Sequence, residues 1–348
     1  MAPDVSAVVV SHRNASDAIE CVRSLAGAFR DEGLAGEIVL VDCGSGPEET
    51  GRLADAGADL LVALPENRGY SGGANAGLAR AGSERLLLCN ADVVFRTGSL
   101  RPLLEASDET GVGAAAPLAY WDAEDRIRLP PGFPSGFLSD LAQLSAGRPE
   151  REAERFATFA RETLSLWERG GSARHLTGAV LAVHRRVLDA VGRFDQRFPF
   201  EYEETEWEDR VLASGRTLQF VPGSRVRHLW GSSAAASAGA EARRSESRRL
   251  YWRRRHGRLG RAVLERASRR AVSRRYPSIP EPRLAARGGA WAAISTNPSL
   301  LPFAGAPLDS EFVLPPEMIA RLPRGPIYLR SFRAVDGRPI ETFTWEKG

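Results

Sequence analysis

The chain has 348 residues, of which 43% are hydrophobic and 26% charged, and its formal net charge is +3. Because domains usually span about 100–200 residues, this length allows one main domain and a smaller appendage. No run approaches the ~20 apolar residues that cross a bilayer, and the first residues lack the basic and apolar regions of a signal peptide. We therefore expect a cytoplasmic protein.

The cysteine content excludes two further classes of protein. The three cysteines, Cys21, Cys43 and Cys89, lie in or beside apolar runs and show no C-x-x-C spacing. This pattern is typical neither of a disulfide framework nor of a zinc site. We expect reduced, buried thiols.

The first ninety residues alternate apolar strands with amphipathic helices, and polar residues follow the strands. Apolar strands that alternate with helices indicate a parallel sheet covered on both faces, with ligands bound at the carboxyl ends of the strands. The predicted strands are Val5–Val10, Glu37–Val41, Leu60–Leu64 and Arg85–Cys89, and the predicted helices are Ala15–Phe29, Pro47–Ala56 and Gly72–Ala81.

The middle of the chain has a looser order of elements. We predict a loop at 130–134, a charged helical insertion at 148–167, a strand at 175–183, a helix at 185–191 and a small-residue loop at 232–240. Beyond Pro277, the short β-like runs 311–314, 327–332 and 342–345 are separated by turn signals. They indicate a small β-rich appendage.

Two polar segments follow predicted strands. Asp42 ends the second strand, where its carboxylate could accept the N–H of a nucleobase or, alternatively, form the turn before Gly44. The segment 67–77, Asn-Arg-Gly-Tyr-Ser-Gly-Gly-Ala-Asn-Ala-Gly, places glycines ahead of a helix. It could bring backbone N–H groups close to a ligand, or it could be a tight turn and nothing more.

A candidate cation site combines residues that are far apart in the chain. Asp92 follows the strand 85–89, and its carboxylate suits a divalent cation that bridges two phosphates. His228 could supply a second ligand. The alternative for His228 is a structural residue among apolar neighbours.

The segment 201–209 carries six carboxylates in nine residues, namely Glu201, Glu203, Glu204, Glu206, Glu208 and Asp209. Such crowding raises the pKa of a carboxyl group, and a group perturbed in this way can act as a general base. A solvated acidic helix start would account for Glu206 and Glu208.

Taken together and in this order, these segments resemble family 2 glycosyltransferases of bacterial, rhamnosyltransferase-like type, over roughly residues 5–257. The segments that carry the resemblance are Val-Val-Val-Ser at 8–11, Val-Asp-Cys-Gly-Ser at 41–45, Asn-Arg-Gly at 67–69, Asn-Ala-Asp at 90–92, Gly-Arg-Phe-Asp at 192–195, the acidic segment and His228. The resemblance implies an inverting, metal-assisted transfer of a sugar from a nucleoside diphosphate to a hydroxyl acceptor, which would be a glycan, a lipid-linked sugar or a natural product.

The resemblance also implies roles for individual residues. Glu204 takes the place of the catalytic base, with Glu203 as the alternative. Asp92 and His228 would hold Mg²⁺ or Mn²⁺, although Asn90 stands where the family's first metal-binding acid is usual. The donor, with dTDP or UDP favoured, would contact Ser11, Asn14, Asp42, Arg68, Gly69, Asn90 and Asp92.

The implied architecture is a GT-A, Rossmann-like α/β fold with a mostly parallel sheet and helices on both faces. We expect a catalytic domain at 1–240, divided into a nucleotide-binding half at 1–115 and an acceptor half at 116–240. A basic helical segment at 241–276 and a β-rich appendage at 277–348 would follow. Competing hypotheses are a sugar-phosphate nucleotidyltransferase and a GT-A-like protein that binds carbohydrate or nucleotide without catalysis.

The basic segment has its own alternatives. From Arg243 to Arg275 there are fourteen arginines and two glutamates, with apolar residues at roughly helical spacing. Amphipathic helices of this kind either pack on the catalytic domain or lie on an anionic membrane at the inner face. Because Tyr251 and Trp252 are too few for base stacking, we expect no nucleic-acid partner.

Overall fold

The computed structural model describes residues 2–133, 136–144, 149–230, 239–269 and 276–348, which divide into two compact units. The first unit comprises 2–118, 170–229 and 239–251. The second comprises 119–133, 136–144, 149–169, 230, 252–269 and 276–348. The described residues between 119 and 169, which the sequence predicts as part of the catalytic domain, therefore group with the C-terminal strands in the structure.

The first unit is built on a mixed sheet with the predicted parallel strands at one side. These are β3 (Leu60–Leu64), β2 (Gly36–Cys43), β1 (Val5–Ser11) and β4 (Arg85–Asn90), in this order and all parallel. Beyond β4 come β8 (Val180–His184), β6 (Val112–Tyr120), β9 (Thr217–His228) and β5 (Val93–Phe95), and β7 (Gly171–Ala173) pairs with β9. Pairs β4–β8, β6–β8, β5–β9 and β7–β9 are antiparallel.

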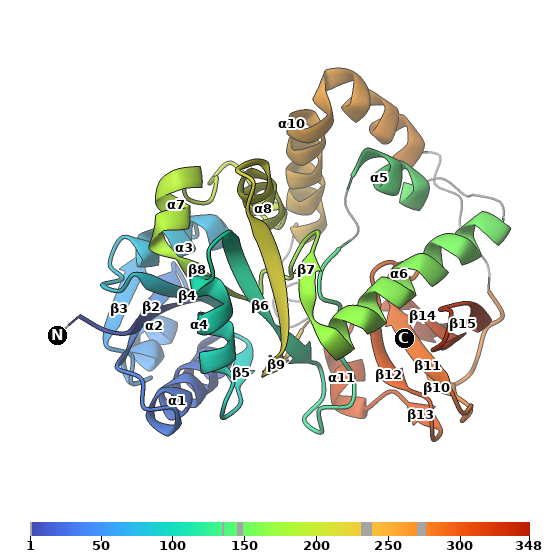
Figure 1. The fold of residues 1–348 in the computed structure, drawn as a ribbon, viewed down its shortest axis with the longest axis horizontal. Coiled ribbons are helices and arrows are strands. Elements are labelled where there is room, and N and C mark those ends of the chain that lie inside the picture. The colour runs from blue at the N-terminus through green and yellow to red at the C-terminus, as the bar shows by residue number, and fades with distance from the viewer. Residues whose placement is uncertain (1, 134–135, 145–148, 231–238, 270–275) are drawn as a thin grey trace. The chain divides into compact units, whose positions relative to one another are not determined.

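Helices cover both faces of this sheet, as predicted. Figure 1 shows α1 (Ala15–Asp31) and α3 (Gly69–Leu78) on opposite faces. The glycines of α3 allow this helix to lie close to β1 and β2. A Cβ at Gly77 would lie 2.3 Å from Cγ1 of Val8, and one at Gly73 would lie 2.5 Å from Sγ of Cys43. The remaining helices of the unit include α2 (Pro47–Ala54), α4 (Leu100–Asp108), α7 (Arg185–Val191) and α8 (Glu203–Ala213).

The predicted strand at 175–183 is wrong in its first half, since β8 begins at Val180. The backbone N–H of Leu176 donates to the carboxylate of Glu208, and the ring of His175 contacts the same carboxylate. These two residues are therefore held by a helix side chain rather than by a strand ladder.

The basic segment is helical, as predicted, but it is interrupted. Helix α10 (Ala240–Ser268) contains Gly257 in a non-helical conformation, with φ 68° and ψ −174°, so that two helical stretches meet there. Most of the small-residue run 232–240 lies outside the described residues, as do 134 and 148 at the ends of two other predicted segments.

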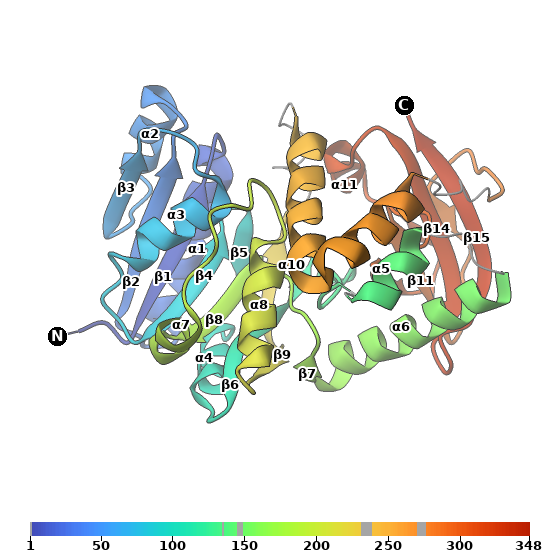
Figure 2. The same cartoon turned by 90° about the horizontal axis from the view of Figure 1, so that it is seen from above.

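The second unit confirms the β-rich appendage. Its sheet has the antiparallel order β12 (Ala304–Pro307), β11 (Ala290–Ser295), β14 (Gly325–Arg333) and β15 (Pro339–Lys347). Helix α6 (Pro149–Arg169) lies alongside this sheet (Figure 2). Aromatic rings pack between the helix and this part of the chain. The shorter elements are α5 (Phe137–Leu144), α11 (Pro316–Arg321), β10 (Arg283–Leu284) and β13 (Phe312–Val313).

The aromatic core explains why α6 belongs to this unit. The ring of Phe156 lies 5.4 Å from the rings of both Phe303 and Phe332, and Trp167 stacks on Trp291 at 5.3 Å. Buried aromatic side chains dominate the packing energy of a core, so the helical insertion and the C-terminal strands stabilise each other.

Two expectations from composition can be compared with the structure. All three cysteines are buried free thiols, as predicted. In the described parts of the chain, no helix is both long and apolar enough to cross a membrane.

Candidate functional site

Polar residues meet at the carboxyl edge of the parallel strands in the first unit. Ser11 lies opposite Asp42 in the β1–β2 register, and Asn90 lies opposite Val10 in the β1–β4 register. The hydroxyl of Ser11 is buried and has no hydrogen-bond partner among the described residues. A buried polar atom without a partner is costly, so this edge is chemically suited to a ligand.

Asp42 is buried and already makes local hydrogen bonds. Its carboxylate accepts the backbone N–H of Ser45 at 3.1 Å and the hydroxyl of Thr50 at 2.5 Å. The turn-forming role is therefore present, and a nucleobase contact stays a prediction. An open hollow of about 490 Å³ lies beside this pair and is lined by Thr50, Gly46, Leu64 and their neighbours.

Three further residues predicted to contact the nucleotide sugar have different local surroundings. Gly69 begins α3 with φ 68°, and a Cβ there would lie 3.4 Å from the carbonyl oxygen of Pro199. Arg68 is half exposed and pairs with Glu66 at 3.2 Å. Asn14 precedes α1, and its amide donates to Asp17 at 2.9 Å.

Asp92 and His228 are brought together by the β5–β9 ladder, in which Val93 pairs with His228. Oδ1 of Asp92 lies 3.3 Å from Nε2 of His228, and both residues are buried. Two ligands on adjacent positions of one Mg²⁺, each with a bond of about 2.1 Å, would lie about 3 Å apart. The pair therefore fits one cation.

Asp92 and His228 alone would not complete the coordination of a metal ion. The described residues contain no group of three or more His, Cys, Asp or Glu side chains that could hold a metal ion. A divalent cation held by only one or two side chains usually takes its remaining ligands from phosphate oxygens and water.

The acidic segment enters α8 through a strained turn. Glu201 and Tyr202 have φ values of 60° and 70°, in the left-handed region that costs a residue other than glycine about 1 kcal/mol or more. The guanidinium of Arg244, from α10, donates to both carboxylate oxygens of Glu201 at 2.8 Å. The basic segment therefore helps to hold this turn.

Glu203 and Glu204 begin α8, and each has a buried carboxylate oxygen without a partner among the described residues. Burial raises the pKa of Glu203 well above its usual range, and the charge of Glu204 adds to this effect. Burial, together with the charges of Glu208 and Glu201, raises the pKa of Glu204 to about 7. A carboxyl group with such a pKa can take up a proton near neutral pH.

Tyr70 lies in the same group of polar atoms. Its hydroxyl is also buried without a described partner. Burial, followed by the charges of Cys89, Glu203 and Glu204, raises the pKa of this phenol well above its usual range. Sequence reasoning missed Tyr70, although it lies inside the glycine-rich segment.

The reading of Glu208 as part of a solvated helix face is wrong. Glu208 is fully buried, and its carboxylate lies 3.0 Å from Nδ1 of His175 and accepts the N–H of Leu176 at 3.2 Å. Burial, together with the charge of Asp209, raises the pKa of Glu208, and the hydrogen bond from Leu176 opposes this shift. Glu206 instead pairs with Arg210 at 3.1 Å.

Gly178 supplies the space that Glu204 occupies. A Cβ at Gly178 would lie 2.9 Å from Cγ and 3.2 Å from Cβ of Glu204. The next residue, Ala179, accepts the backbone N–H of Asn90 at 2.9 Å. Glu204 therefore lies beside the segment that follows β4, and this juxtaposition joins the acidic segment to the Asn-Ala-Asp segment.

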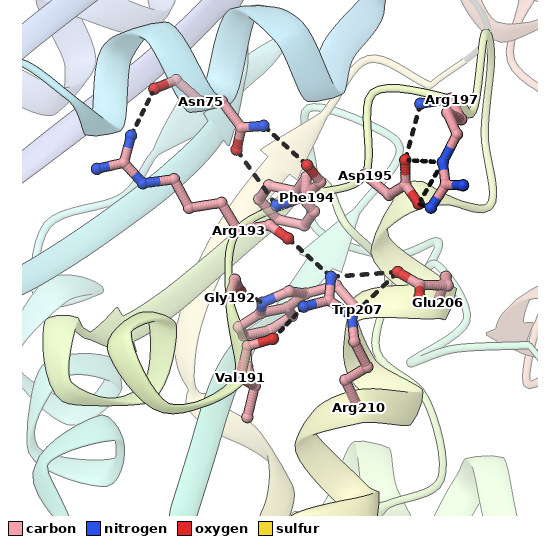
Figure 3. A network of polar contacts seen from close by, with 10 residues as sticks. All are labelled: Asn75, Val191, Gly192, Arg193, Phe194, Asp195, Arg197, Glu206, Trp207 and Arg210. Atoms are coloured by element: carbon pink, nitrogen blue, oxygen red, sulfur yellow. Dashed lines mark hydrogen bonds and ion pairs between the residues drawn. The ribbon is translucent and has the colours of Figure 1, made fainter.

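A polar network fixes the loop between α7 and α8 (Figure 3). The side chain of Asn75 both donates to and accepts from the backbone of Phe194, and Trp207 donates to the carbonyl of Gly192 at 2.9 Å. Arg210 donates to the carbonyls of Val191 and Arg193. This network ties α8 to α3, so the Gly-Arg-Phe-Asp segment has a positioning role.

The sequence of the first part of the chain decides the family. Residues 6–151 match the model described as "Glycosyl transferase family 2". This part of the chain belongs to glycosyl transferase family 2. The family predicted from the sequence is thereby confirmed, and Ser11, Asp42, Asn90 and Asp92 lie inside the matched residues. Glu203, Glu204 and His228 lie outside them.

One curated relative and two solved structures are similar to parts of this chain. The succinoglycan biosynthesis protein ExoO of Rhizobium meliloti (strain 1021) is 35% identical over 116 residues, which are 32% of each chain. The chain therefore spans about a third of that relative's length. GalNAc-T7, solved with UDP, GalNAc and Mn²⁺, is 18% identical, with a TM-score of 0.48 and coverage of 65% of this chain and 43% of that one. The mannosyltransferase PcManGT of Pyrobaculum calidifontis, solved with GDP-Man and Mn²⁺, is 18% identical, with a TM-score of 0.47 and coverage of 77% and 70%.

Proposed function

We propose that the chain is an inverting glycosyltransferase that moves a sugar from a nucleoside diphosphate to a hydroxyl group of an acceptor. The family match over residues 6–151 supports the reaction class. The acceptor would be a glycan, a lipid-linked sugar or a natural product. The donor nucleotide would be dTDP or UDP.

The observation that carries the proposal is the buried carboxyl group of Glu204, with its raised pKa, beside Gly178. In the proposed reaction, Glu204 accepts the proton of the acceptor hydroxyl while that oxygen bonds to the anomeric carbon. The bond from this carbon to the diphosphate breaks on the opposite face, so the configuration inverts. General-base catalysis of this kind contributes about 10²–10⁴-fold to a rate.

The donor would lie along the carboxyl edge of the parallel strands. Asp42 would accept the base N–H groups, while Ser11 and Asn14 would lie near the nucleoside. Arg68, Gly69 and Asn90 would lie near the diphosphate. The buried, unpartnered hydroxyl of Ser11 supports a ligand at this edge.

Asp92 and His228 would hold Mg²⁺ or Mn²⁺, because their facing atoms are 3.3 Å apart. When bound, the cation would neutralise negative charge on the diphosphate. Within the described protein, the Asp92 carboxylate and the His228 imidazole are already oriented toward each other by the ladder between β5 and β9.

The direct test is transfer from labelled dTDP-, UDP- and GDP-sugars to an acceptor panel, with and without Mn²⁺, by the wild type and by Glu204→Gln. We expect the substitution to lower kcat by about 10²-fold or more and to leave donor binding within a few-fold. In the wild type, kcat should rise with pH through about 7, since the base must be ionised. Undiminished transfer by Glu204→Gln would contradict the assignment, and a larger loss in Glu203→Gln would make Glu203 the base.

A protein that binds nucleotide sugars without catalysis would give a different result. It would bind a labelled donor but would show neither transfer nor donor hydrolysis, and Glu204→Gln would change no rate. A nucleotidyltransferase would release diphosphate from a nucleoside triphosphate and a sugar phosphate.

A further inference from the structure

The second helical stretch of α10 has a solvent-exposed face that mixes aliphatic and basic residues. We define the outer face of α10 by the exposed residues Arg258, Leu259, Ala262, Val263 and Arg266, together with Arg269, which directly follows the helix. Leu259 is 85% exposed and Val263 is 46% exposed. Leu259 and Val263 are four residues apart, and Arg266 is three residues further on, so they share one side of the helix.

The helix has a distinct inner side. Leu264 is fully buried. The helical hydrogen-bond pattern continues to Arg269, whose backbone N–H donates to the carbonyl of Glu265 at 3.2 Å. The side chain of Glu265, which is half-buried at the edge of the outer face, lies 3.6 Å from Arg261. The exposed residues of the outer face are therefore basic or apolar, and the glutamate at its edge is paired with an arginine.

Helix α5 lies beside α10 within the same unit (Figures 1 and 2). The ring of Phe137 packs edge-on against His256 at 5.4 Å, and Trp252 donates to Asp140 at 3.1 Å. The next residue on α5, Leu138, is 77% exposed. Leu138 and Leu259 are among the most exposed large hydrophobic side chains of the described residues.

We propose that the outer face of α10 docks on the surface of an anionic lipid bilayer. Exposed leucine and valine side chains enter the boundary between headgroups and acyl chains, while arginines beside them contact lipid phosphates. The charge of the face is complementary to anionic lipids. The helix would lie in the plane of the interface.

Two features favour a bilayer over a nucleic acid. The large exposed side chains on this face are aliphatic, and the face offers no aromatic ring on which a base could stack. Highly exposed leucine side chains also gain little from a phosphate backbone, whereas a bilayer removes them from water.

The test is co-sedimentation of the full chain with vesicles made of equal parts of phosphatidylcholine and phosphatidylglycerol, compared with phosphatidylcholine alone. We expect partitioning onto the anionic vesicles to be higher by about tenfold or more and to fall as salt is raised. The double variant Leu259→Gln, Val263→Gln should lose about tenfold in partitioning, and Arg258→Gln, Arg266→Gln, Arg269→Gln should lose the preference for anionic vesicles.

Val335 provides a matched control, because it is 84% exposed in the same unit but lies in the turn between β14 and β15. Val335→Gln should partition like the wild type. Equal binding to both kinds of vesicle would overturn the proposal, as would an equal loss in Val335→Gln and the Leu259 double variant. Binding of single-stranded RNA through the same arginines, without vesicle binding, would also overturn it. None of these outcomes depends on glycosyl transfer.

Discussion

Nδ1 of His175 lies 3.0 Å from Oε2 of Glu208, and both side chains are buried in the first unit. The pair joins the loop before β8 to α8. Leu176 donates its N–H to the same carboxylate, and two residues later Gly178 contacts Glu204. Glu208 therefore positions the loop segment against which the proposed base packs.

Removing this carboxylate should cost both stability and activity. We expect Glu208→Ala to lower the free energy of unfolding by about 2–4 kcal/mol, because it leaves a cavity and buried polar groups without a partner. Glu208→Gln keeps the size of the side chain and should cost less stability while still lowering kcat. Urea unfolding and initial rates measure both effects.

Glu206 on the same helix is the matched control, since its carboxylate pairs with Arg210 nearer the surface. Glu206→Gln should change the free energy of unfolding by about 1 kcal/mol or less. If Glu206→Gln and Glu208→Gln behave alike, the buried pair has no special role.

Gly178 should be sensitive to the addition of a single methyl group. In Gly178→Ala, the new Cβ would lie 2.9 Å from Cγ of Glu204, so the carboxylate must move. We expect kcat to fall by about tenfold or more with only a small change in Tm, since misplacing a catalytic group costs rate rather than folding energy.

Gly223→Ala is the control for this methyl group, because its nearest neighbour would be Cβ of Pro102 at an ordinary 3.9 Å. Neither glycine has a left-handed φ, so alanine is compatible with both backbones. An unchanged kcat in Gly178→Ala would show that the position of Glu204 is not critical.

The parallel half of the sheet could be predicted from sequence, and the structure gives β3 the predicted bounds, Leu60–Leu64. Its strands are short apolar runs between turn signals, so the local pattern suffices. Strand β6 was missed because its alanines favour helix as readily as strand, and β9 because polar residues, Pro222 and Gly223 interrupt its pattern.

Candidate site residues can be proposed from sequence where one segment carries the chemistry, and buried partners are missed where the chain folds back on itself. Glu203 and Glu204 can be singled out in the sequence because they lie in a segment crowded with carboxylates. His175 and Glu208 are 33 residues apart, and neither stands in a pattern that indicates the other. Only the packing of α8 on the loop before β8 brings them together.

Glu203 should make the stability of the protein depend on pH. Its pKa is raised in the folded state by burial, so the folded protein binds more protons than the unfolded chain at pH values above the usual glutamate range. Stability should therefore fall as pH rises above the usual glutamate range.

Glu203→Gln removes this ionisation while keeping the shape of the side chain. The variant should gain stability relative to the wild type at pH 8, and the gain should be smaller at pH 5, as measured by urea unfolding at both values. Glu84→Gln, whose side chain is 70% exposed, should show no such difference. Identical losses of stability with pH in the wild type and Glu203→Gln would mean that Glu203 ionises normally in the folded protein.

Asp92 and His228 should govern the response to divalent cations. Because their facing atoms are 3.3 Å apart, replacing either residue leaves a bound ion with one protein ligand instead of two. We expect Asp92→Asn and His228→Gln each to raise the Mn²⁺ concentration needed for half-maximal transfer by about tenfold or more. Removing the metal with a chelator should abolish transfer in the wild type, and added Mn²⁺ should restore it.

His184→Gln is a suitable control, because His184 ends β8 next to Arg85, at the amino end of the parallel strands. Its Mn²⁺ response should match that of the wild type. If Asp92→Asn keeps the wild-type response, the pair is a structural hydrogen bond between β9 and the segment before β5, and the cation is held elsewhere or is not required.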